Sequence, residues 1–202
     1  MDGPARVDVL WLPLGAGGHS VRVNGRVWEA VGAWRAGRER RDLYHAGLEV
    51  TLPEGRWTIE QTPVPAGDPA DRGVVVQGPV MSRLAGRFRL FRYEVRCWRD
   101  GVIPDAAEAV GDPVTVTRSP ARARAVLAMA PRIPPLVWGR DPCGAGEMWN
   151  SNSVVAWLLT RAGMDADAVP PPTGGRAPGW RTGILVARGW GPGTPLERPG
   201  TP

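Results

Sequence analysis

The sequence predicts an α+β fold in which helices pack against an antiparallel sheet. Apart from a short helix expected at residues 30–40, strand-length apolar runs fill most of the first half of the chain, and the main helical patterns follow in the second half. Strands that precede helices, rather than alternating with them, are typical of this class. No internal repeat is visible, and 202 residues suit one domain. We expect that single domain to cover residues 1–188, followed by a disordered tail at 189–202.

The strand predictions follow from alternating apolar residues and from the turns between them. Asn24-Gly25, between alternating valines, predicts a two-residue hairpin, because both turn positions favour a positive φ. Apolar and charged side chains also alternate between Phe91 and Cys97, as burial of one face of a strand requires. We expect strands at residues 7–12, 42–50, 56–60, 73–78, 88–98 and 183–187.

Two helices are predicted from the residues at their ends. Ser119 and Pro120 are typical of an N-cap and a first helical position, and this helix should continue as far as Pro131. A second helix is expected to begin at about Asn150 and to end just before Gly163, a residue type that favours the left-handed backbone of a helix end.

The composition excludes several classes of protein. The net charge is +5, but all 25 basic residues are arginines, and their densest stretch, Trp34 to Asp42, is interrupted by acidic residues. A nucleic-acid surface needs basic residues clustered on one face, so we expect no nucleic-acid partner. No run approaches the roughly 18 apolar residues of a membrane span. The N-terminal residues lack the pattern of a secretory signal, so we expect a cytoplasmic protein.

Metal and cofactor sites are not expected. The chain has two cysteines and two histidines, and no two of them lie within ten residues of each other. A structural zinc site usually begins from a closely spaced pair of such ligands. We therefore predict free thiols, no metal and no cofactor, while the oligomeric state does not follow from the sequence.

Four polar residues, Asn150-Ser151-Asn152-Ser153, stand at the start of an apolar run. Asn and Ser are preferred N-caps, but a cap requires only one of them. A serine at this place would gain from the positive end of the helix dipole. A histidine on a neighbouring strand, such as His45, could take its proton. Glu60 ends the next predicted strand, where a third polar group could orient the histidine in a catalytic triad.

These segments resemble the circularly permuted branch of the papain-like NlpC superfamily, which includes lecithin:retinol acyltransferase-like and PPPDE-like proteins. "LYHAGLEV" has the H-x-G-[apolar]-x-V character of the family's histidine strand, and "WNSNSVVAWLL" matches its N-C-x-x-[apolar]-[apolar] context. The resemblance covers residues 43–160. It implies a permuted papain-like topology with His45 as the base, Glu60 as the second polar group and Asn150-Ser151 in place of the Asn-Cys pair.

The departure from the family is Ser151, which stands where the resemblance places a cysteine. A serine hydroxyl is not ionised by a helix end, so it would need His45 as a true general base. The resemblance implies a hydrolase or acyltransferase that acts on an amide, ester or thioester of a small molecule or peptide. Cys143 and Ser153 remain alternative nucleophiles, and Glu49 is an alternative partner for His45. The competing hypothesis is an inactive papain-like fold that binds a ligand or another protein.

Overall fold

The structure is a computed structural model that describes residues 5–14, 37, 39–64, 73–103 and 106–189. Within these ranges the strands are β1 (Arg6–Pro13), β2 (Tyr44–Leu52), β3 (Gly55–Pro63), β4 (Val74–Pro79), β5 (Arg92–Arg99) and β6 (Val114–Thr117). The α-helices are α2 (Pro120–Met129), α3 (Ser151–Arg161) and α4 (Trp180–Ala187). Short 3-10 turns are η1 (Ala85–Arg87), η2 (Arg89–Phe91), η3 (Ala106–Glu108), η4 (Ala130–Arg132) and η5 (Ala166–Ala168). The predicted hairpin at Asn24-Gly25 and the predicted tail from residue 190 onward lie outside the described residues.

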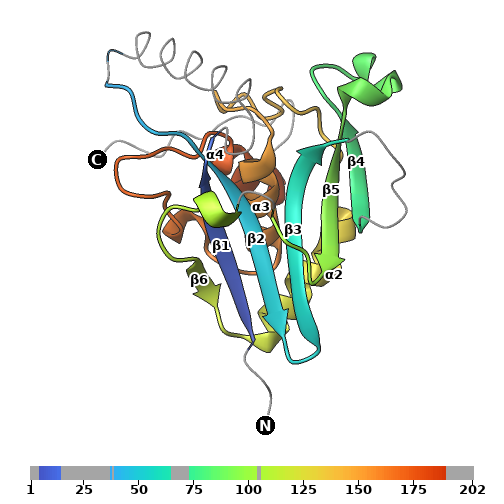
Figure 1. Cartoon of the computed structure of the whole chain (residues 1–202). Coiled ribbons are helices and arrows are strands. Elements are labelled where there is room, and N and C mark those ends of the chain that lie inside the picture. Colours follow the sequence, from blue (N-terminus) through green and yellow to red (C-terminus); the bar gives the residue numbers. More distant parts are fainter. Residues whose placement is uncertain (1–4, 15–36, 38, 65–72, 104–105, 190–202) are drawn as a thin grey trace.

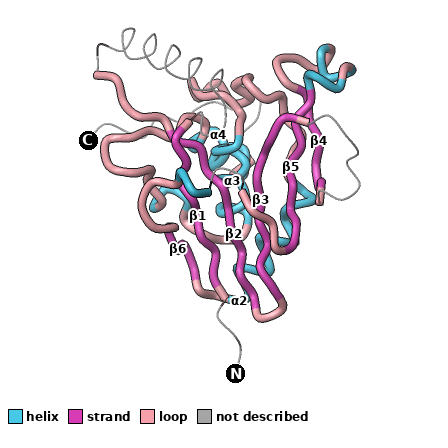
Figure 2. The backbone as a smooth tube through the Cα atoms, viewed as in Figure 1, coloured by secondary structure: helices cyan, strands magenta, loops and turns pink. Residues whose placement is uncertain are grey.

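The six strands form one antiparallel sheet with the order β4-β5-β3-β2-β1-β6 (Figure 2). The α+β class with an antiparallel sheet is therefore confirmed. β2 and β3 form the expected hairpin and pair from Leu52 with Gly55 to Leu48 with Ile59. Beyond that pair the two strands part (Figure 1), and β3 continues beside β5 while β2 continues beside β1. The described residues thus leave positions 45–47 of β2 without a strand partner on the β3 side.

One face of the sheet carries the main core. Alternate residues of the strands point to this face, where α2 and α3 cover them and α4 packs against α3 (Figure 1). The strand residues that contribute to this core and are fully buried are Val7, Val9, Leu48, Val50, Ile59, Tyr93 and Val95. Because side chains alternate along a strand, the intervening residues must point to the opposite face.

The opposite face carries a smaller apolar cluster and a polar region. Leu10 and Leu12 of β1 pack with Ile103, which belongs to the segment that follows β5. That segment also accepts a 2.8 Å hydrogen bond at Gly101 O from the buried Thr58 hydroxyl of β3. Residues after β5 therefore fold back over this face. None of the helices in the described ranges is both long enough and apolar enough to cross a membrane.

The two predicted helices are present with their expected ends. The Ser119 side chain accepts a hydrogen bond from the Arg122 amide, as an N-cap does. At the end of α3, Gly163 has a φ of 78° and its amide bonds to Thr160 O at 3.1 Å, while Met164 N bonds to Leu159 O at 2.9 Å. These two bonds define a Schellman ending, which explains the glycine.

One strand prediction was wrong, one strand was predicted to begin too early, and one strand was missed. Residues 183–187 lie in α4, because a short apolar run without clear periodicity is compatible with either a buried strand or a buried helix. The strand expected at 88–98 begins only at Arg92, and the preceding residues form η1 and η2. β6 is only four residues long, which is too short for a period-two pattern to stand out.

Candidate functional site

Asn150 and Ser153 form a reciprocal cap at the start of α3. The Asn150 side chain accepts a 3.2 Å hydrogen bond from the Ser153 amide, and the Asn150 amide donates to the Ser153 hydroxyl at 3.1 Å. The Ser153 hydroxyl is fully buried and donates to Gly179 O at 2.7 Å. Asn150 is therefore the predicted N-cap. Ser153 acts as a structural residue, and its hydroxyl is not placed to attack a substrate.

Asn152 ties the helix start to two distant parts of the chain. Its side chain is only 2% exposed, and its amide nitrogen donates to Tyr44 O at 3.0 Å and to Pro178 O at 2.8 Å. Tyr44 is the first residue of β2. The residue that follows Ser151 is thus hydrogen-bonded to the residue that precedes His45.

Ser151 is the one member of the polar cluster whose side chain has no structural role. It is half-buried, and its hydroxyl makes no hydrogen bond to any residue that the structure describes. As the first residue of α3, it lies at the positive end of the helix dipole. The amides of Ser151 and Asn152 have no acceptor within the helix, because the first turn of a helix provides none.

His45 and Glu60 share the face of the sheet opposite α3. His45 lies across from Leu12, and its neighbours Tyr44 and Ala46 point into the main core. Glu60 follows the core residue Ile59, so alternation places it on the same face as His45. The structure therefore brings the two predicted triad members to one face, near the point where β2 and β3 part.

No hydrogen bond between described atoms joins Ser151 to His45. Their backbones are brought close by the bond from Asn152 to Tyr44, but the His45 side chain leaves β2 on the far face. Residues 45–47 of β2, which include His45, have no strand partner on the β3 side.

Both candidate carboxylates contact arginines. A nitrogen of Arg96 lies 3.7 Å from the Glu60 carboxylate, and Arg56 lies 3.1 Å from that of Glu49. Arg96 also forms a 2.7 Å ion pair with Glu94, whose side chain is fully buried. Arg96 therefore links the candidate orienting residue Glu60 to a buried charge on the neighbouring strand.

Gln61 is a candidate that the sequence prediction missed. It is 8% exposed, and neither its amide nitrogen nor its amide oxygen bonds to a described atom. The Asn152 side-chain oxygen is also buried without such a bond. Buried polar groups are nearly always hydrogen-bonded, so an unpaired one requires an explanation, and a bound polar ligand would provide one. The sequence does contain a signal for Gln61. Trp57 and Ile59 place every second residue of this strand on the core face, and Gln61 is a polar residue at the next such position.

Cys143 lies in a tight loop before α3. The Asp141 carboxylate accepts hydrogen bonds from the amides of Cys143, Ala145 and Gly146, at 2.7 to 3.1 Å. Burial raises the pKa of the Cys143 thiol, and the negative charge of Asp141 raises it further. A nucleophilic cysteine needs the opposite shift, so this environment disfavours Cys143 as the attacking group.

Both cysteines are expected to react slowly with iodoacetamide at neutral pH. Burial raises the pKa of Cys97 to about 11, and the pKa of Cys143 is also raised. Since only the thiolate reacts, each rate should climb about tenfold per pH unit below the pKa. Mass spectrometry of the wild type, with Cys97→Ser and Cys143→Ser to assign the signals, measures this. If Cys143 reacts fast and its rate hardly changes above neutral pH, its thiol is already ionised there, and Cys143 is again a candidate nucleophile.

The protein thus belongs to the α+β class. The polar residues at the start of α3 lie beside the end of β2 that does not pair with β3. Within the described ranges, no group of three or more His, Cys, Asp or Glu residues could hold a metal ion. No protein-family model, no curated protein and no solved structure matches the chain.

Proposed function

We propose that the chain is a hydrolase or acyltransferase in which Ser151 attacks the carbonyl of an amide, ester or thioester. The observation that carries this proposal is the division of roles at the start of α3. Asn150, Asn152 and Ser153 hold the helix in place, whereas the half-buried Ser151 hydroxyl has no bond to a described residue. The order of histidine strand and serine helix supports the resemblance to the permuted NlpC branch, which remains part of the proposal.

In this mechanism His45 acts first as a base and then as an acid. It takes the proton of the Ser151 hydroxyl as the oxygen attacks, and an ester bond forms between Ser151 and the acyl group. His45 then protonates the leaving amine, alcohol or thiol. In the second half, His45 takes a proton from water or an acceptor as that molecule attacks the acyl-enzyme, and it passes the proton to the Ser151 oxygen as the ester bond to Ser151 breaks. Glu60 orients His45, and the first amides of α3 stabilise the oxyanion.

A binding module on the same fold is the second candidate. The ion pair between Arg96 and Glu60 favours it, because a carboxylate held by arginine is less available to a histidine. The unpaired polar atoms of Gln61 and Asn152 also suit recognition of a polar ligand without chemistry. This candidate predicts a Ser151 hydroxyl that does not react.

Labelling of the full chain with a fluorophosphonate probe separates the two candidates. We expect the wild type to be labelled and Ser151→Ala to be unlabelled, while Ser119→Ala, which changes another helix-start serine, should be labelled normally. His45→Gln should slow labelling by about 10²- to 10⁴-fold, the usual contribution of a general base. Failure to label the wild type, or labelling that survives in Ser151→Ala, rules out the serine nucleophile.

A further inference from the structure

Exposed apolar side chains gather in one short segment of the chain. Among the described residues, those of Met81, Leu84, Phe88 and Leu90 are 61%, 67%, 68% and 85% exposed. The other large hydrophobic residues that are exposed in the described ranges are three valines, at positions 102, 110 and 114. Single exposed apolar residues are ordinary, but four large ones within ten residues usually mark an interaction site. We call residues 81–90 the β4–β5 tip.

The β4–β5 tip is a projecting, internally bonded structure. It connects β4 to β5 through η1 and η2 and extends beyond the end of the sheet (Figure 1). Its base is closed by the bonds from Val80 N to Phe91 O at 2.8 Å and from Met81 N to Trp138 O at 2.9 Å. Arg92, the first residue of β5, donates to Gly86 O of the tip at 2.7 Å. The apolar side chains are therefore held outward by a folded segment.

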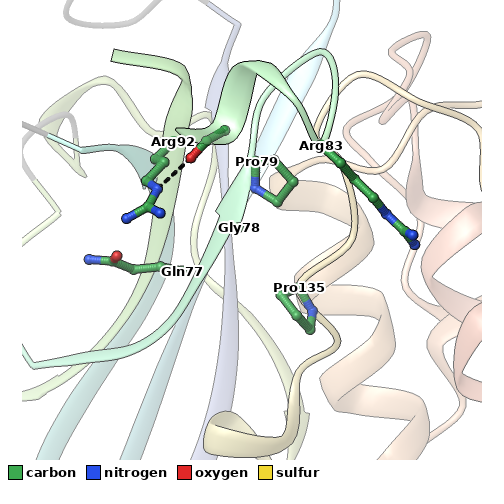
Figure 3. A pocket seen from close by; sticks show the side chains of 7 residues that line it. Gln77, Gly78, Pro79, Arg83, Arg92 and Pro135 are labelled. Carbon is green, nitrogen blue, oxygen red and sulfur yellow. Dashed lines mark hydrogen bonds between the residues drawn. The ribbon is translucent and has the colours of Figure 1, made fainter. Parts of the chain in front are cut away.

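The charge of the tip has one sign. Arg83, Arg87 and Arg89 are interspersed among the apolar residues, Arg92 lies two positions after the tip, and no acidic residue occurs from Val80 to Tyr93. A depression of about 480 Å³ lies at the base of the tip. Arg83 and Arg92 lie on either side of it, with Pro79 and Pro135 between them (Figure 3). The surface thus combines guanidinium groups and large apolar side chains.

We propose that the β4–β5 tip docks on the surface of an anionic lipid bilayer. Guanidinium groups bind phosphate with paired hydrogen bonds, and a negative bilayer attracts clusters of arginine. Phe, Leu and Met side chains enter the boundary between headgroups and acyl chains. The four apolar side chains of the tip are all exposed, and a soft bilayer boundary can adapt to the segment that carries them. The proposal concerns a surface remote in sequence from Ser151 and does not depend on the acyl-transfer function.

Sedimentation of the full chain with lipid vesicles tests the proposal. We expect binding to vesicles of equal parts phosphatidylcholine and phosphatidylglycerol, and none to phosphatidylcholine alone. Phe88→Ser with Leu90→Ser should abolish binding, whereas Val102→Ser with Val110→Ser, exposed valines elsewhere, should not change it. Arg83→Gln with Arg87→Gln should weaken partitioning about 25-fold, since each arginine near the surface contributes about fivefold. All these side chains are exposed, so the variants should fold.

A second pair of arginines provides the matched control for charge. Arg118→Gln with Arg122→Gln removes the same charge from exposed positions around the start of α2 and should leave binding unchanged. The proposal is overturned if the wild type does not sediment with the anionic vesicles, as expected for a tip that binds an acidic protein instead. It is also overturned if the Arg118/Arg122 pair weakens binding as much as the tip pair, or if the Phe88/Leu90 pair has no effect.

Discussion

Replacing Gly183 by alanine is expected to lower the free energy of unfolding by about 3 kcal/mol, at the upper end of the effect of overpacking a core. Gly183 lies in α4 where this helix touches the first turn of α3. A Cβ atom added at Gly183 would lie 2.8 Å from Cα and the carbonyl carbon of Ser153, and closer still to its carbonyl oxygen. These are backbone atoms, so no side-chain rotation relieves the contact. Alanine favours a helix over glycine by about 1 kcal/mol, which offsets only part of the cost.

Urea denaturation of the full chain measures this effect. Arg181→Ala is the matched control, because Arg181 lies on the exposed side of the same helix and should change stability by less than about 0.5 kcal/mol. Fluorophosphonate labelling of Gly183→Ala should also slow, since the displaced turn carries Ser151. Equal midpoints for Gly183→Ala and the wild type would show that α3 and α4 are not packed as closely as described.

Replacing Arg96 by methionine is expected to destabilise the protein by about 3–5 kcal/mol. Arg96 supplies a 2.7 Å ion pair to Glu94, a carboxylate on the same strand with no exposed side-chain surface. Breaking a buried ion pair from one side is costly, because the remaining charge stays in a medium that solvates it poorly. The same substitution removes the guanidinium that lies 3.7 Å from Glu60.

A double variant distinguishes loss of the ion pair from loss of packing. Glu94→Gln with Arg96→Met removes both charges and should recover most of the stability lost in Arg96→Met, as measured by the same denaturation experiment. Arg99→Met, an exposed change on the same strand, should cost only about 1 kcal/mol, because it removes a hydrogen bond to Glu54 O and a contact with the Trp57 ring but leaves no buried charge. If the double variant is no more stable than Arg96→Met, the buried charge is not the source of the cost.

Local patterns in the sequence predicted the elements that local interactions determine. The hairpin of β2 and β3, the cap at Ser119 and the glycine ending of α3 each depend on residues a few positions apart. α4 was predicted as a strand, because its apolar run is buried by α3, which begins 29 residues earlier in the chain. The pattern around Gly183 holds no information about that contact.

The candidate site was predictable only in part for the same reason. The N-cap at Asn150 follows from the residue type, but the partners of Asn152 and Ser153 are backbone atoms at Tyr44, Pro178 and Gly179. The alternation in β5 was expected to expose Glu94, yet it is fully buried. The alternation of side chains along a strand assigns each residue to a face of the sheet, but it does not show which other segments cover that face.

The starts of α3 and α4 are joined by a shared set of bonds. Pro178 O accepts from both Asn150 and Asn152, Gly179 O accepts from Ser153, and Gly179 N donates to the Glu147 carboxylate at 2.9 Å. Neither helix can lose its first turn without breaking bonds of the other. The two helix starts therefore form one cooperative unit in local unfolding, and a ligand that engages Ser151 would slow amide exchange in α4 as well as in α3.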